Sequence, residues 1–382
     1  MKWQARAILA AIAVPLAAGL AIPVRAADPP RITGPFVHEN LAVYFLHGTS
    51  APGPVPLTLK EALAAGTVKV TETGKVNELT IENTGKAEVF VQAGDIVKGG
   101  QQDRVLTVSF LVPPKSGRMP IGAFCVEQGR WSARGNEDVK QFASADKAVP
   151  SRDAKLAMLA PAKPRTASAA AATPPTNDNV GVTGGVTGVA RGRIDLAGRG
   201  GDYSDTGSRQ SGVWQSVAEA QAKLSANVGA PVASGQSASS LQLSLENKKL
   251  DENRAAFIAK LKPAGEAESD IIGYVFAVNG QVNSGDVYPS NGLFRKMWAK
   301  LIEASATEAI ADKTGKAADA SPAMAPSVED VRAFLVRAEA GNTNLTKIDG
   351  SLTRETRDAD SALFLETRKA SGGFVHRAYV AR

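Results

Sequence analysis

Between residues 67 and 94 the chain carries three short runs of high β-propensity with very short breaks between them. The runs TVKVTETGK, NELTIENTGK and AEVFVQAG are separated at Gly74-Lys75 and at 83–86. Asn and Gly in such breaks supply the positive φ angles that tight turns need. Connections this short leave no room for the crossover that parallel strands require. The segment therefore predicts an antiparallel β meander.

Apolar runs elsewhere predict further strands at both ends of the chain. The sequence IIGYVFAVNGQVNSGDVY (271–288) is the clearest hairpin, because Asn279-Gly280 suits a two-residue turn. The other predicted strands are 36–48, 104–114, 119–131, 361–368 and 372–382. We expect the last strand to return to the first sheet.

Helical periodicity is concentrated in the second half of the chain. Helices are predicted at 57–66, from Ser211 onward, at 251–262 before Pro263, at 291–310, and after the capping-box pair Ser327 and Asp330. Strands at both ends with helices between them predict an α+β fold, in which an antiparallel β-rich sheet or sandwich carries helices mainly from the second half.

The composition changes abruptly in the middle of the chain. Residues 160–207 are dominated by Ala, Gly, Pro, Ser and Thr without apolar periodicity. Such a segment cannot bury enough surface to offset its ordering entropy. We therefore expect a disordered insertion between a β-rich first half (30–150) and an α+β second half (208–382) of one domain. A second low-complexity loop is expected at 311–326.

The first 27 residues have the order of features of a signal peptide. Lys2 and Arg6 precede an apolar run at 7–24, and the small residues Ala26 and Ala27 follow it. Because proline and glycine interrupt the run, cleavage is favoured over a membrane anchor. No later segment reaches the roughly 18–20 apolar residues of a membrane span. The sequence predicts an exported chain, periplasmic or secreted, with no membrane span after signal cleavage.

Charge and residue types exclude several classes of partner. The net charge of +6 is spread along the chain, and aromatic residues make up 5% of it. Nucleic-acid binding, which needs basic residues clustered among aromatics, is not expected. His38, His47 and His376 are far apart in sequence and no CxxC or HExxH motif is present, so no metal site is predicted. We expect no cofactor.

The stretch VQAGDIVKGGQQDRV (91–105) concentrates polar groups around two glycines. Its candidate ligand-binding residues are Asp95, Lys98, Gln101, Asp103 and Arg104. A Gly-rich loop with basic residues can hold an anion through backbone N–H groups. It is not a P-loop, because Lys98 precedes the glycines and no GK[ST] follows. The alternative is a hairpin or bulge whose charges are solvated or paired.

The stretch CVEQGRW (125–131) supplies a second set of candidates. Cys125 and Glu127 are two residues apart on a predicted strand and share a face, and Arg130 and Trp131 lie beyond Gly129. A catalytic thiol would need an activating base or positive field. The alternative is an inert buried thiol beside a structural Glu127–Arg130 ion pair. Glu127, Arg130 and Trp131 join the candidate ligand-binding set.

Five motifs together resemble one family. They are GDIVKGGQQDRV, CVEQGRW, GYVFAVNGQV, SGDVYPSNGLFRKMWAKLIEASATEAI and FVHRAYV. The chain resembles the ADP-ribosylglycohydrolase and rhodanese-phosphatase-superfamily associated protein domain over residues 34–145 and 208–382. The family's name reflects genomic association with ADP-ribose and phosphatase systems. The resemblance implies no defined activity. The associated systems imply a cytosolic setting, and an exported copy departs from that setting.

The sequence leaves three functions open. We favour an exported domain that binds an unknown small ligand or envelope protein through the 94–104 loop and the 125–131 strand end. One alternative is a hydrolase acting on phosphorylated or ADP-ribose-like substrates through Asp95, Asp103 or Glu127. The other is a structural cell-envelope protein that makes its contacts through the 160–207 insertion.

Overall fold

The computed structural model describes residues 30–159, 203–314 and 325–382. The predicted signal peptide, most of the predicted insertion and most of the loop at 311–326 lie outside the described residues. From Arg31 onward the described residues form one compact unit. No helix among the described residues is long and apolar enough to cross a membrane.

Strands are spread over the whole described chain. They are β1 Arg31–His38, β2 Leu41–His47, β3 Leu57–Thr58, β4 Val68–Glu72, β5 Glu78–Asn83, β6 Val89–Val91, β7 Asp95–Gly99, β8 Arg104–Leu106, β9 Phe110–Val112, β10 Arg118–Cys125, β11 Phe142–Ala148, β12 Ile271–Val278, β13 Gln281–Val287, β14 Asn342–Lys347, β15 Leu352–Ala359, β16 Ala362–Lys369 and β17 Phe374–Ala381. The helices are α1 Leu59–Ala64, α2 Arg152–Leu159, α3 Tyr203–Val228, α4 Leu241–Leu245, α5 Lys248–Glu266, α6 Asn291–Ala311 and α7 Val328–Glu339.

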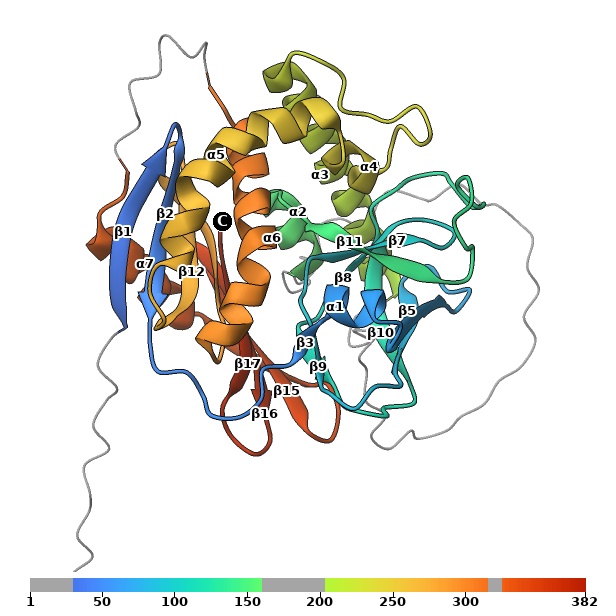
Figure 1. Ribbon diagram of the computed structural model, residues 1–382, viewed down its shortest axis with the longest axis horizontal. Coiled ribbons are helices and arrows are strands. Elements are labelled where there is room, and N and C mark those ends of the chain that lie inside the picture. The colour runs from blue at the N-terminus through green and yellow to red at the C-terminus, as the bar shows by residue number, and fades with distance from the viewer. Residues whose placement is uncertain (1–29, 160–202, 315–324) are drawn as a thin grey trace, which may run out of the picture. The chain divides into compact units, whose positions relative to one another are not determined.

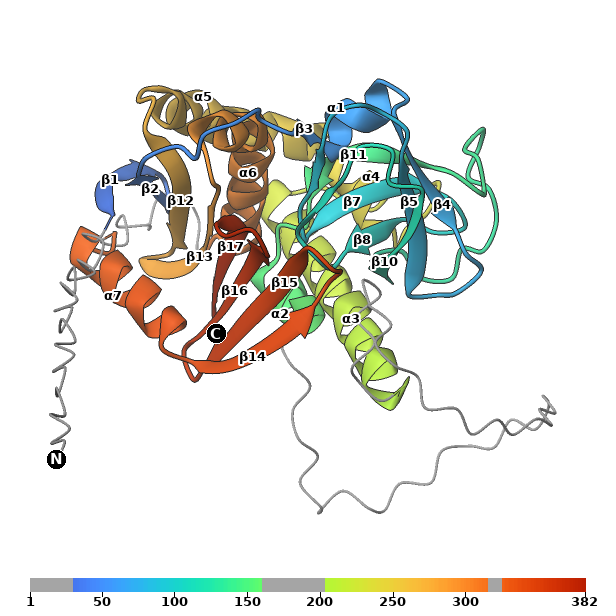
Figure 2. The ribbon, with the colours of Figure 1, turned by 90° about the horizontal axis from the view of Figure 1, so that it is seen from below.

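Three sheets organise the fold. The largest has eight strands in the order β1-β2-β12-β13-β17-β16-β15-β14, so both ends of the described chain share it. A six-stranded sheet has the order β11-β7-β8-β10-β5-β4, and a three-stranded sheet has the order β3-β6-β9. Figures 1 and 2 show the two smaller sheets gathered on one side of α6 and β1, β2 and β12 on the other. The predicted α+β, β-rich fold is confirmed.

The large sheet is covered on both faces at its β2–β12 end. Every residue of β2 is buried, which explains its continuous apolar run LAVYFLH. Leu41, Val43 and Phe45 belong to the main core, and α5 and α6 pack on that side of the sheet. The alternate residues Tyr44 and Leu46 face a second core. Helix α7 contributes Val331, Phe334, Leu335 and Ala338 to that core.

Several local predictions are confirmed. β12 and β13 form the predicted hairpin, with φ angles of 51° at Asn279 and 77° at Gly280 in its turn. Helix α6 buries the predicted residues Leu293, Met297, Leu301 and Ile302. The capping box of Ser327 and Asp330 is present at the start of α7. β17 returns to the sheet that contains β1 and β2.

The first correction concerns strands that the sequence joined together. The predicted strand 36–48 is a hairpin of β1 and β2 that turns at Glu39-Asn40, where Glu39 has a φ angle of 48°. The run 104–114 divides into β8 and β9, which belong to different sheets. Phe36 and Val37 before the first break are apolar although they are 37% and 40% exposed, and β8 and β9 on either side of the second break are buried, so hydrophobicity gave no sign of either break.

The predicted meander is also only partly correct. β4 and β5 pair as expected, but β6 leaves them and pairs with β3 and β9. The Asn83 side chain holds this departure, since its amide donates to the carbonyl oxygens of Ala87, Val112 and Pro113. A side chain that satisfies backbone groups of two other segments fixes a chain path that strand propensity does not encode.

Two helix boundaries differ from the prediction. α5 runs through Pro263 to Glu266. Trp298 packs against Gly265 in that last turn and its indole donates to the Lys262 carbonyl, so tertiary contacts hold the turn that proline was expected to end. α3 begins at Tyr203, inside the segment predicted as insertion. β14 and β15 were not predicted, since their charged and threonine-rich sequences have a weak apolar pattern.

Candidate functional site

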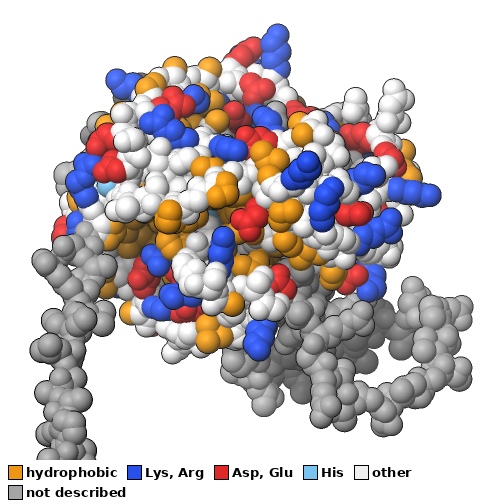
Figure 3. All heavy atoms as spheres, turned by 60° about the horizontal axis from the view of Figure 1, so that its bottom comes forward, with side chains coloured by type: hydrophobic (Ala, Val, Ile, Leu, Met, Phe, Trp, Pro, Cys, Tyr) orange, Lys and Arg blue, Asp and Glu red, His pale blue; other side chains and the backbone are white. Residues whose placement is uncertain are grey.

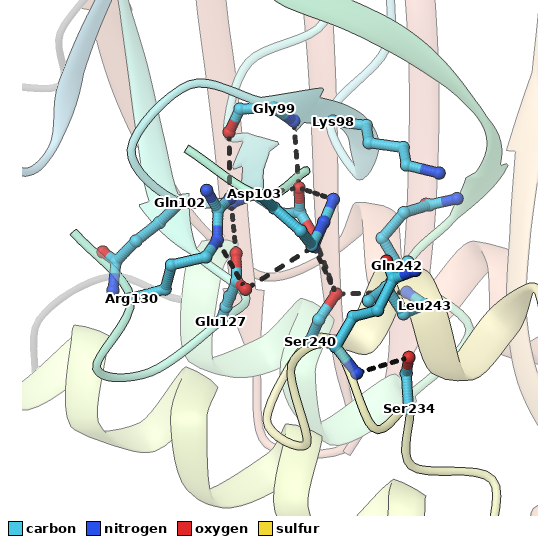
Figure 4. Close-up of polar contacts among 12 residues, drawn as sticks. Lys98, Gly99, Gln102, Asp103, Glu127, Arg130, Ser234, Ser240, Gln242 and Leu243 are labelled. Carbon is cyan, nitrogen blue, oxygen red and sulfur yellow. Dashed lines mark hydrogen bonds and ion pairs between the residues drawn. The ribbon is translucent and has the colours of Figure 1, made fainter. Parts of the chain in front are cut away.

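Both polar stretches singled out by the sequence meet beside α4 (Figure 4). Asp103 and Glu127 are fully buried and joined through the backbone, because the Asp103 N–H donates to Glu127 Oε2 at 3.0 Å. Arg130 Nε donates to Glu127 Oε1 at 2.7 Å. The predicted Glu127–Arg130 ion pair is therefore present, and it lies against the loop that carries Asp103.

Asp103 is the centre of this arrangement. Arg134 holds it in a bidentate pair, with Nη1–Oδ2 and Nη2–Oδ1 distances of 2.9 and 3.0 Å. The Ser240 hydroxyl donates to Oδ2 at 2.7 Å, and the Gly99 N–H donates to Oδ1 at 3.0 Å. Both carboxylate oxygens thus accept two hydrogen bonds each. We call Asp103, Glu127, Arg130, Arg134 and Ser240 the Asp103 network.

Arg130 clamps the glycine loop to this network. Its Nη1 and Nη2 donate to the carbonyl oxygens of Gly100 and Gly99 at 3.1 and 3.2 Å. Gly99 and Gly100 have φ angles of 113° and 56°. A Cβ on Gly100 would lie 2.3 Å from Phe142 Cζ, so only glycine fits there. The two glycines serve the backbone path.

The electrostatics of Glu127 follow from these contacts. Burial raises the pKa of its carboxyl group, but hydrogen bonds from Arg130, Ser237 and the Asp103 N–H outweigh burial and leave the pKa below its ordinary value. Glu127 is therefore an ionised, fully enclosed carboxylate at neutral pH. An acid or base must reach the substrate by hydrogen bond, and neither Asp103 nor Glu127 is exposed to do so.

Arg104 and Cys125 form a separate buried pair on the other side of the same strands. Arg104 Nη1 lies 2.9 Å from Cys125 Sγ and donates to Gln102 Oε1 at 3.1 Å, while Nη2 is 3.6 Å from Glu72 Oε1. Burial raises the pKa of the Cys125 thiol to about 11, despite the nearby Arg104 charge. A thiol with so high a pKa carries almost no thiolate at neutral pH, so Cys125 behaves as an inert core residue.

Three candidates lie elsewhere or at the surface. Asp95 turns to α6, where Lys300 Nζ lies 2.7 Å from its Oδ1. Lys98 points away from Asp103 and pairs with both oxygens of Glu246 at 2.9 and 2.8 Å (Figure 4). Trp131 is 55% exposed. The structure thus brings Asp103, Glu127 and Arg130 together and separates Asp95 and Arg104 from them.

A second polar cluster lies inside the fold around Asp95. The Gln92 backbone N–H donates to Asp95 Oδ2 at 3.0 Å, and its side-chain amide donates to Asp286 Oδ1 at 3.2 Å. The Tyr288 hydroxyl donates to Gln92 Oε1 at 2.6 Å. Asp286 thus joins Asp95 through Gln92, while Asp103 remains in its own network.

Sequence reasoning missed the residues that complete both clusters. Arg134 lies only three residues beyond CVEQGRW, in WSARG, so its proximity was a usable signal. Ser240 and Lys300 are more than 100 residues from Asp103 and Asp95 in the chain and carry no motif. A third group, His47 with Glu268 and Asp270, has the donor types of a metal site, but Arg31 Nη2 lies between them at 2.7–2.9 Å.

The comparisons with known proteins establish the family. The model of the ARG and Rhodanese-Phosphatase-superfamily-associated Protein domain matches residues 30–380. The chain therefore belongs to this family, and the described unit is that domain. No curated protein and no solved structure matches the chain.

Proposed function

We propose that this protein is a binding domain whose contact surface centres on Trp131. The observation that carries the proposal is a large aromatic side chain, 55% exposed, on a segment held at both flanks. Arg130 is anchored to Glu127 and the glycine loop, and Arg134 is anchored to Asp103. Tryptophan is enriched in binding hot spots, and a contact that is already rigid loses little entropy on binding.

The Asp103 network supports binding rather than hydrolysis. Its carboxylates are enclosed, and each accepts hydrogen bonds from buried donors. A carboxylate held in this way lacks the free approach that acid–base or metal chemistry needs. The charges of the network instead fix the positions of the Trp131 segment and the glycine loop.

A thermal-shift screen tests this function. The probes are nucleotides, ADP-ribose, phosphosugars, cell-wall fragments, MgCl₂ and ZnCl₂, applied to the wild-type chain and to Trp131→Ala. A ligand that binds the folded state alone raises the unfolding temperature. The matched control is Val336→Ala, which removes another exposed apolar side chain, 63% exposed, on α7.

We expect at least one probe to stabilise the wild type and Val336→Ala but not Trp131→Ala. A shift that survives in Trp131→Ala, or no shift with any probe, contradicts a contact surface at Trp131. Turnover of phosphoester or glycoside substrates by the same samples, with or without divalent metals, would favour the hydrolase alternative instead.

We also propose that the chain is exported after cleavage behind Ala27. The support is the order of charge, apolar run and small residues in the first 27 positions. N-terminal sequencing of the protein recovered from cell fractions tests it. The expected product begins at Asp28 and lies outside the cytoplasmic fraction. An intact N-terminus in the cytoplasm contradicts export.

A further inference from the structure

A small pocket lies between the large sheet and the loop that joins β8 to β9. It is lined by Arg354 of β15, Thr367 of β16, His376 of β17, and Thr107 and Ser109 of that loop, and its cavity volume is about 20 Å³. The cavity is far smaller than the roughly 300–1,000 Å³ pockets that hold drug-sized ligands, so its ligand must be small. Figure 2 shows β15, β16 and β17 side by side at this end of the sheet.

The register of the sheet builds the polar floor of the pocket. Arg354 pairs with Thr367, and Thr367 pairs with His376. Directly opposed residues on neighbouring antiparallel strands project from the same face. The three side chains therefore form one row across three strands. The Thr367 hydroxyl donates to the Ser109 carbonyl at 2.6 Å, which ties the row to the loop above it.

Arg354 differs from the arginines of the Asp103 network because no carboxylate pairs with it among the described residues. Its Nε is shielded from solvent and has no hydrogen-bond partner. Burial lowers the pKa of its guanidinium group, and the neighbouring charge of Arg209 lowers it further. Arg354 as a whole is partly exposed. A cation that no carboxylate neutralises and that an anion can reach from solvent favours anion binding.

Hydroxyl groups add neutral donors to the same pocket. The Ser109 oxygen accepts the Ala93 N–H at 2.9 Å, which leaves its own proton to donate. Thr107 contributes a second hydroxyl to the lining. His376 is buried, with Nε2 3.1 Å from Asp286 Oδ1. None of the described residues that line the pocket is acidic.

We propose that this pocket binds a small oxyanion, either a free phosphate or sulfate or the terminal phosphate of a small phosphomonoester, with Arg354 as the charged contact. A guanidinium presents planar, paired N–H donors that match a tetrahedral oxyanion. The site is independent of the Trp131 surface, so either proposal can fail without the other.

Thermal unfolding in matched salts tests the site. Wild-type protein is compared in sodium chloride, sodium phosphate, sodium sulfate and glycerol phosphate at equal ionic strength. We expect the oxyanions to raise the unfolding temperature by about 2–4 °C, the effect of roughly 1 kcal/mol or more of added binding free energy. Arg354→Gln should remove this rise, and Arg354→Lys should reduce it.

The matched control is Arg118→Gln, which removes the same charge from an arginine that is 79% exposed on β10. It should respond to oxyanions like the wild type. Equal responses of Arg354→Gln and Arg118→Gln overturn the proposal, because the effect would then be general to the salt. Comparing phosphate with glycerol phosphate identifies the source of the anion, since the larger Arg354-dependent rise marks the better ligand.

A crystallographic test of the site uses the wild-type protein and does not require any variant to fold. Crystals of the wild-type protein soaked in selenate should show an anomalous peak beside the Arg354 guanidinium. Selenate peaks confined to other positions, together with no oxyanion-dependent shift in solution, would exclude the site.

Discussion

The Asp103 network and the Arg354 pocket both place arginines inside the same protein, but they treat the charge in opposite ways. Arg134 forms a bidentate pair with Asp103, and its second donor group also reaches Glu137 at 2.9 Å. Arg354 has no carboxylate beside it within the described chain. Nε lacks a hydrogen-bond partner in both arginines, so the difference between them is the counter-ion.

This contrast distinguishes charged side chains that hold the fold together from a charged side chain that has no counter-ion. A buried ion pair held by several hydrogen bonds defines a loop position, and its enclosed groups are not available to a ligand. An unpaired cation in a small pocket has unused donors. The charged motif most visible in the sequence is therefore a structural region, whereas Arg354, the charged residue of the proposed pocket, lies in none of the five family motifs. Figure 3 shows acidic and basic side chains interspersed on one face of the molecule.

Among the substitutions that test this comparison, Asp103→Asn should lower the free energy of unfolding most. The change keeps the shape of the side chain but removes the charge of Arg134's bidentate partner, and Glu137 and Glu127 remain as its carboxylate neighbours. Removing one partner of a buried pair costs about 3–5 kcal/mol. Urea denaturation should show this loss in the free energy of unfolding. A loss below about 1 kcal/mol, the value of a surface pair, would mean that the network does not hold the fold.

Gly100→Ala tests the glycine loop that the network holds. Its added Cβ meets Phe142 Cζ at 2.3 Å and Glu72 Oε1 at 2.7 Å, at a φ angle of 56°. Backbone strain and overpacking together should cost about 2–4 kcal/mol in thermal or urea unfolding.

The matched control for this change is Gly129→Ala. Its φ angle is 85° and nothing lies within 4 Å of the added Cβ, so backbone strain of about 1–2 kcal/mol is the whole expected cost. Equal losses in the two variants would show that Phe142 moves aside and that the loop is not tightly packed.

Glu127 makes the network sensitive to acid. Its folded pKa is below the ordinary value of about 4.3, so the unfolded chain binds the proton more readily. The stabilisation is fully present above that ordinary value and is lost as the pH falls through the lower folded pKa. Between pH 5 and 2 the free energy of unfolding should therefore fall less steeply in Glu127→Gln than in the wild type. The same dependence of the free energy of unfolding on pH in both proteins would contradict the lowered pKa of Glu127.

Lys98→Ala should have the smallest effect. Lys98 pairs with Glu246 at the surface, where water screens the pair. The expected loss in the free energy of unfolding is about 0–1 kcal/mol, and it should shrink further in 1 M salt. A loss as large as that of Asp103→Asn would place Lys98 within the structural network rather than at its edge.

Much of the fold was accessible from local patterns. The Asn279-Gly280 turn, the buried stripe of α6 and the capping box of α7 depend on neighbouring residues, and each was predicted correctly. The joined runs 36–48 and 104–114 were not resolved, because apolar residues stand on both sides of each break, exposed at Phe36 and Val37 and buried in β8 and β9. A pattern of hydrophobicity does not record where a hairpin turns or which sheet a strand enters.

The candidate site was predictable in composition but not in arrangement. The pairing of Glu127 with Arg130 followed from a spacing of three residues and is observed. Asp95 and Asp103 are eight residues apart, yet Asp95, at the start of β7, pairs with Lys300 of α6, while Asp103, in the loop after β7, accepts from Ser240 at the start of α4. Ser240 and Lys300, which decide those two environments, come from distant segments.

By itself the sequence determined the family, the α+β class and the turns and helix stripes whose physics is local. Only the tertiary structure decided which charges are paired. The pairing of Arg134 with Asp103 and the isolation of Arg354 depend on sheet register and on helices brought from more than 100 residues away. The electrostatic free energy of a charged group inside a protein depends on its distance from other charges and on its burial. Neither quantity can be read from the order of the residues.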